Sequence, residues 1–157
     1  MTCFALTCLV ISFILHAGYV TYIYIKYKPD CISRSYYLLK NKYIFTVWII
    51  LVACLIFPAW VEISPIYFQF LPFLSVCSLA IVGLCPNYLD SDRIIHITAA
   101  SITCILSLIW NLVAGMYLLP ILFCMILIIL YASKAKNCFF WTENLAFLNI
   151  YLSILLS

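Results

Sequence analysis

The chain has 157 residues, of which 68% are apolar and only 8% are charged, with a formal net charge of +3. Soluble domains carry roughly a quarter charged residues, so this sequence cannot cover itself with a water-exposed surface. We therefore expect an all-α integral membrane protein that folds as a single bundle domain over residues 1–157. The small and dispersed positive charge excludes a nucleic-acid-binding surface.

Six apolar runs are long enough to cross a bilayer, whose hydrocarbon core of about 30 Å needs roughly 20 helical residues. Glu62 and Pro65 oppose continuation of the second run, and Pro86 is predicted to end the third. Pro72 and Pro120 fall inside the third and fifth runs, where kinks are tolerated. The first run lacks the flanks of a signal peptide, so we expect a retained helix. In chain order the runs cover about 2–25, 43–63, 66–84, 94–113, 116–132 and 138–156.

Basic residues are confined to alternate connections between these runs. They fall in the first, third and fifth connections, and none falls in the second or fourth. Short loops rich in Lys and Arg stay in the cytoplasm. The distribution therefore predicts six transmembrane helices with both termini on the exterior side. The residues concerned are Lys26, Lys28, Arg34, Lys40, Lys42, Arg93, Lys134 and Lys136.

Neither the cysteines nor the isolated His16 indicates a metal site. No cysteine pair has the CxxC spacing of a zinc ligand set. His16, alone within the first run, is expected to be a packing or hydrogen-bonding residue. Inside apolar runs a thiol behaves as a small hydrophobe, and this describes Cys3, Cys8, Cys54, Cys77, Cys104 and Cys124.

Four tryptophans stand near the ends of the apolar runs: Trp48, Trp60, Trp110 and Trp141. Tryptophan in such places is typical of the aromatic belt at the level of the lipid headgroups. We therefore expect belt residues, with a platform for a sugar or a sterol as the alternative.

Polar side chains gather on the bundle face that the first, third and fifth connections share. That face receives Ser33 from the first connection, Asp90, Asp92 and His96 from the third, and Glu143 near the start of the sixth run. Ionisable residues within a membrane span usually face the bundle interior and have a partner. We therefore expect His96 and Glu143 to face inward and to lie near each other. The acidic turn would cover a polar pocket, with Ser33 as a further wall.

These polar residues have two possible interpretations: they carry out chemistry, or they stabilise the structure. Ser33, Asp90, Asp92, His96 and Glu143 are the candidate catalytic residues, and the last four are also candidate ligands of a divalent metal such as zinc. In the structural interpretation, Asp90 or Asp92 caps the fourth helix and His96 bonds to a carbonyl. Ser33 is then a loop or capping residue.

Three stretches resemble the six-helix membrane families related to DRAM and Frag proteins and their uncharacterised bacterial counterparts: CISRSYYLLKNKYIFTVWI, AIVGLCPNYLDSDRIIHITAA and WTENLAFLNIY. These families look distantly like the membrane hydrolase superfamily of alkaline ceramidases and progestin-type receptors, which bind zinc through a Ser, an Asp and three His. This chain has no HxxxH, so a zinc site would need acidic side chains in place of the missing imidazoles. The matching positions are Ile32 with Ser33, Gly83 with Pro86, His96 with Ala99 and Ala100, and Glu143.

Three function classes follow from the residues and the resemblance. The leading hypothesis is a multi-pass membrane protein without a proven activity that binds lipid. The alternative is a metal-dependent hydrolase of lipid amide or ester bonds, in which His96 and an Asp bind the metal and Glu143 acts as ligand or base. A transporter or pore subunit is the third, although no inverted repeat supports it. The expected partner is membrane lipid, self-association into a homo-oligomer stays open, and the expected location is a bacterial inner membrane.

Overall fold

The structure, a computed structural model, describes residues 1–85 and 90–157, and the side chains of residues 90–92 lie outside this description. The described parts are helical and contain no strand. The elements are α1 (Cys3–Tyr27), α2 (Ser35–Leu38), α3 (Tyr43–Ile63), η1 (Ile66–Phe68), α4 (Phe70–Leu84), α5 (Asp90–Val113), α6 (Leu118–Ala132) and α7 (Cys138–Leu156).

Within the described residues, five helical segments are long and apolar enough to cross a membrane, and the protein is therefore a polytopic membrane protein by composition and length. They are Cys3–Tyr27, Tyr43–Ile63, Ile66–Leu84, Arg93–Val113 and Cys138–Leu156. The remaining apolar helix, α6, has 15 residues. At about 1.5 Å per residue it is roughly 22 Å long, shorter than the hydrocarbon core of a typical bilayer.

Helix boundaries follow the proline and polar signals closely. Helix α3 ends at Ile63, directly before the Ser64–Pro65 pair. Pro72 and Pro120 stand in the first turns of α4 and α6, where backbone N–H groups have no intrahelical partner, so no hydrogen bond is lost. The described part of α4 ends at Leu84. The predicted role of Pro86 as helix terminator lies outside the described residues. Helix α5 is described from Asp90, so Asp92 lies within the helix, and the capping contacts of both aspartate side chains lie outside the described side chains.

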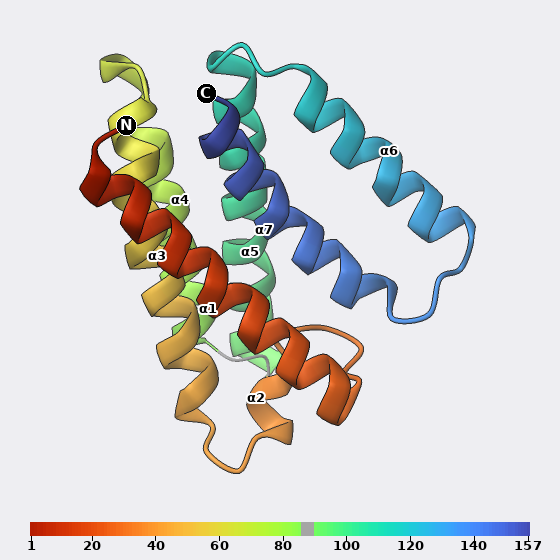
Figure 1. The fold of residues 1–157 in the computed structure, drawn as a ribbon. Helices are drawn as coiled ribbons and strands as arrows, with labels where there is room; N and C mark the ends of the chain where they lie inside the picture. Colours follow the sequence, from red (N-terminus) through yellow and green to blue (C-terminus); the bar gives the residue numbers. More distant parts are fainter. Residues whose placement is uncertain (86–89) are drawn as a thin grey trace.

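The helices run up and down, so that their connections alternate between two ends of the bundle (Figure 1). Both chain termini lie at one end, together with η1. The short helix α2 lies at the other end, and so does the connection between α6 and α7. All Lys and Arg residues therefore belong to the end that holds α2. Helix α6 stands away from α1 and α3 and contacts α5 and α7.

Three of the four tryptophans are core residues, which contradicts the aromatic-belt interpretation for them. Trp48, Trp60 and Trp110 are only 6%, 2% and 0% exposed, whereas Trp141 is 37% exposed. The indole N–H of Trp110 donates to Ser64 Oγ at 2.7 Å, and that of Trp48 donates to a backbone carbonyl at 3.3 Å. For Trp48 and Trp110, the hydrogen-bond partner of the indole N–H therefore lies inside the bundle and not in the headgroup region.

His16 is a packing and hydrogen-bonding residue, as predicted. Its imidazole is 1% exposed and lies between the rings of Trp48 and Phe147, with centroid distances of 5.7 Å and 4.5 Å. Its Nε2 is 3.1 Å from the side-chain oxygen of Asn144. This contact joins α1 to α7 through a polar pair within an aromatic core.

Candidate functional site

A cavity of about 560 Å³ lies between the main bundle and α6. Its wall is mostly apolar and aromatic, and its polar side chains include Glu143, Ser33 and His96. Ligand sites of about 300–1,000 Å³ with a few polar groups among apolar ones are typical of small-molecule binding. The apolar wall includes Phe45, Trp48, Ile49, Leu79, Val82, Phe123, Leu127, Phe139, Ala146, Phe147 and Ile150.

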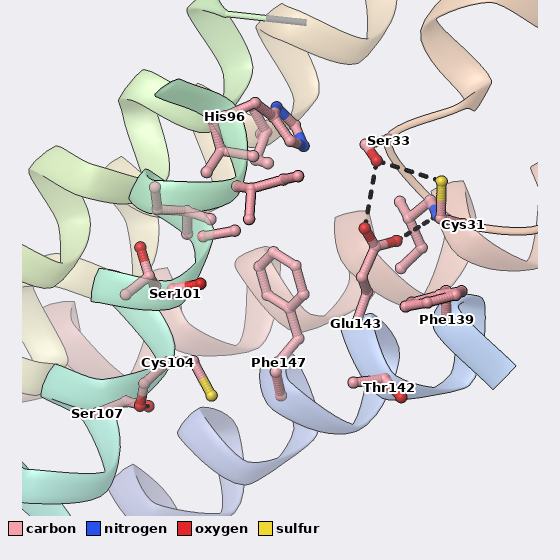
Figure 2. Close-up of a pocket in the computed structure, with 18 of the residues that line it drawn as sticks. Cys31, Ser33, His96, Ser101, Cys104, Ser107, Phe139, Thr142, Glu143 and Phe147 are labelled. Atoms are coloured by element: carbon pink, nitrogen blue, oxygen red, sulfur yellow. Dashed lines mark hydrogen bonds between the residues drawn. The ribbon is translucent and has the colours of Figure 1, made fainter. Parts of the chain in front are cut away.

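Glu143, on α7, is hydrogen-bonded to segment 30–33 at one end of this cavity. One carboxylate oxygen accepts the backbone N–H of Ile32, and the other accepts the Ser33 hydroxyl at 3.2 Å (Figure 2). A backbone hydrogen bond from Phe140 N–H to the Asp30 carbonyl, at 2.8 Å, joins the same two elements. The last contact also satisfies one of the N–H groups that the start of α7 leaves without an intrahelical partner. We call segment 30–33 with its contacts to α7 the loop clamp.

Two residues with a left-handed backbone flank the helices that the loop clamp joins. Lys28, directly after α1, has a left-handed backbone with φ of 47°, which turns the chain away from the helix axis. Asn137, directly before α7, has φ of 59°. Asparagine tolerates this region better than most residues, whereas a lysine there needs support from its surroundings. The chain thus turns at the end of α1 and again before α7, and segment 30–33 contacts the start of α7.

His96 lies across the cavity from the loop clamp, on α5 (Figure 2). Its side chain is buried, with the residue 4% exposed, and Nδ1 donates to the Cys85 carbonyl at 2.8 Å. This bond ties α5 to the end of α4 and satisfies a carbonyl that the helix end leaves free. In a neutral imidazole that donates through Nδ1, the other ring nitrogen, Nε2, is an acceptor.

Cys31 adds a thiol to the loop clamp. Its Sγ is 3.4 Å from Ser33 Oγ, and the residue lines the cavity. Burial, reinforced by the nearby Glu143 carboxylate, raises the pKa of the Cys31 thiol. A raised pKa keeps the sulfur protonated and a poor nucleophile. The side chain therefore contributes an S–H group at this end of the cavity and not a reactive thiolate.

Three of the five candidate residues, Ser33, His96 and Glu143, line this one cavity. Ser33 and Glu143 are in contact, but His96 and Glu143 are bonded to different partners, Cys85 and the loop clamp. His96 and Glu143 therefore both face the cavity, but each is hydrogen-bonded to other groups: His96 to the Cys85 carbonyl, and Glu143 to the Ile32 N–H and the Ser33 hydroxyl. Asp90 and Asp92 lie outside the described side chains.

Among the described residues, no group of three or more His, Cys, Asp and Glu side chains is placed to hold a metal ion. A zinc site that includes Asp90 or Asp92 stays a prediction, and so does the hydrolase chemistry that depends on it.

Several site residues carried no sequence signal of their own. The backbone N–H of Ile32 is a main partner of Glu143, and a backbone group is invisible to motif reasoning. The sequence pattern predicts a headgroup position for Trp48, whereas Trp48 lines the cavity. Phe123 is the one residue of α6 that is buried, and only the packing of α6 against the bundle shows that it faces the cavity.

No protein-family model matches this chain, and neither a curated protein nor a solved structure does. The candidate site is therefore assigned from the geometry of its residues alone.

Proposed function

We propose that this protein binds a hydrophobic, lipid-like molecule in the cavity beside α6. The observation that supports this function is an apolar cavity of about 560 Å³ whose polar groups include Glu143, Ser33 and His96. An amphiphile matches such a site, because its chain is buried against the apolar wall and its head finds hydrogen-bond partners.

Access from the bilayer fits the same proposal. Helix α6 supplies Phe123, Leu127 and Tyr131 to the cavity wall, while most of its other side chains are exposed to the surroundings of the bundle. In a membrane those surroundings are lipid. A wall made of one thinly packed helix is the part of the bundle that opens at least cost.

The test uses Trp48, which lines the cavity. A fatty chain that carries bromine atoms quenches a tryptophan only at close range, so binding in the cavity should quench Trp48. Trp60 and Trp110, whose ring centroids are 5.8 Å apart, are buried and are not among the residues that line the cavity. Their emission should change little.

We also propose a topology of six membrane crossings, with α6 as a short crossing and both termini outside. The support is that all eight Lys and Arg residues belong to one end of the bundle. Reporter fusions after Gly115 and after Ser157 should both report the exterior. A cytoplasmic signal at either position would contradict this topology. Membership of the DRAM/Frag-like families and location in a bacterial inner membrane belong to the same proposal.

A further inference from the structure

We propose that the ligand of this cavity is a single-chain lipid whose head is a primary amine, held by Glu143. The inference rests on the proposed function and names the chemical class of the ligand. It follows from the hydrogen-bonding capacity of the polar groups, from the charges that line the cavity, and from the cavity's volume.

The polar groups that Glu143, Ser33 and His96 present to the cavity are mainly acceptors. The Glu143 carboxylate accepts two hydrogen bonds from the loop clamp. A cationic head beside Glu143 favours the ionised carboxylate, which has about four lone-pair sites, so roughly two remain for the head. The Ser33 hydroxyl uses its hydrogen on Glu143 and keeps its lone pairs, and His96 offers Nε2 as an acceptor once Nδ1 donates to Cys85. A head that donates several hydrogen bonds satisfies these groups.

The charges favour a cationic head over an anionic one. Among the described side chains that line the cavity, Arg93 is the only cationic one, and it is exposed. Asp30 also lines the cavity, and its carboxylate pairs with Arg34. A carboxylate or phosphate placed beside Glu143 would be a buried like-charge pair, which is costly, whereas an ammonium there forms a charge-assisted hydrogen bond.

The volume admits one chain. At roughly 30 Å³ per small heavy group, the share of one water molecule in the liquid, 560 Å³ holds about 18 to 19 such groups. This corresponds to one hexadecyl chain with a compact head. A phospholipid with two chains and a glycerophosphate head has more than about twice as many heavy groups, so much of it would lie outside the cavity.

The experiment compares three probes with the same chain: hexadecylamine, hexadecanol and palmitate. Each competes with a brominated chain for quenching of Trp48 in the purified protein at pH 7, where a primary amine is cationic. In the wild type we expect hexadecylamine to bind about tenfold more tightly than either of the others. Glu143→Gln keeps a side-chain acceptor for the Ile32 N–H but removes the charge. It should abolish the preference for the amine, and it should weaken hexadecanol binding much less than hexadecylamine binding.

The matched control is Glu62→Gln. Glu62 carries its charge at the other end of α3, where it contacts Thr2 and does not line the cavity. This variant should retain the preference of the wild type. Each probe also partitions into the detergent micelles, to the same extent for every variant. The ratio of the dissociation constants of two variants for one probe is therefore independent of this partition. If Glu143→Gln does not fold, the wild type is also titrated with hexadecyltrimethylammonium, which carries the positive charge but has no N–H donor, and it should bind more weakly than hexadecylamine. Equal or tighter binding of hexadecyltrimethylammonium would then overturn the amine inference.

The possible outcomes separate the two proposals. Equal binding of the three probes, tighter binding of palmitate, or an unchanged amine preference in Glu143→Gln would each overturn the amine inference and leave the lipid-binding function standing. If none of the three probes binds the wild type, the proposed function itself fails.

Discussion

Gly83→Ala should lower the free energy of unfolding by about 1–3 kcal/mol, the usual cost of overpacking a core. A Cβ atom at Gly83 would lie 2.1 Å from Ile49 Cγ2 and 3.5 Å from the Thr46 carbonyl oxygen. Ile49 cannot turn away easily, because a β-branched side chain in a helix has one strongly preferred rotamer. The close approach of α3 and α4 is also held by a hydrogen bond from Thr46 Oγ1 to the Gly83 carbonyl, at 2.8 Å. Thermal unfolding in detergent measures the effect.

Two further variants make this prediction specific. Gly18→Ala, in α1, adds the same methyl group where nothing lies within 4 Å, so it should be neutral or slightly stabilising. Ile49→Leu removes the γ-methyl branch while it conserves volume, and Gly83→Ala should then cost less than in the wild-type background. An equal cost in both backgrounds would show that the contact between Gly83 and Ile49 does not set the distance between α3 and α4.

Glu143→Ala should destabilise the protein by about 1–3 kcal/mol, because it leaves the Ile32 N–H and the Ser33 hydroxyl of the loop clamp without their acceptor. Glu143→Gln should cost less, since its side-chain oxygen still accepts one of these bonds. Hydrogen exchange gives a local readout: the Ile32 amide should exchange much faster in Glu143→Ala than in the wild type.

Glu62→Ala is the matched control for this second prediction. Its carboxylate contacts the first residues of the chain in an exposed setting, where ion pairs contribute little. It should leave the thermal unfolding temperature and the exchange of the Ile32 amide nearly unchanged. If Glu143→Ala left exchange at Ile32 unchanged as well, the loop clamp would not depend on the carboxylate.

Hydropathy and charge predicted much of this fold because both act over whole segments. The apolar run at 43–63 coincides with α3, and the run at 138–156 coincides with α7. The short elements α2 and η1 were not predicted, because single helical turns carry little periodic signal. Pro72 and Pro120 lie within apolar runs, but the runs do not show where each helix begins. Both prolines lie in the first turn of a helix, where they cause no kink.

Prediction of the site was weaker because its contacts join residues far apart in the chain. Glu143 was singled out as an acid that a lipid-facing helix would not carry, and it does line the cavity. Its partner was not predictable, since one partner is the backbone of Ile32, 111 residues earlier. Trp48 has a ring that suits a headgroup belt and a protein core equally well, so its residue type could not distinguish these two places.

The most direct test of lipid binding in the cavity is the quenching of Trp48 by a brominated hexadecyl chain, taken as the difference between the wild type and Trp48→Phe. We expect saturable quenching of Trp48 that is largely lost in Ala146→Phe, because the larger side chain occupies the cavity that Ala146 lines. Leu152→Phe, on an exposed part of α7, should quench like the wild type. Quenching of Trp48 that does not saturate, or that is the same in Ala146→Phe and Leu152→Phe, would contradict a ligand site in this cavity.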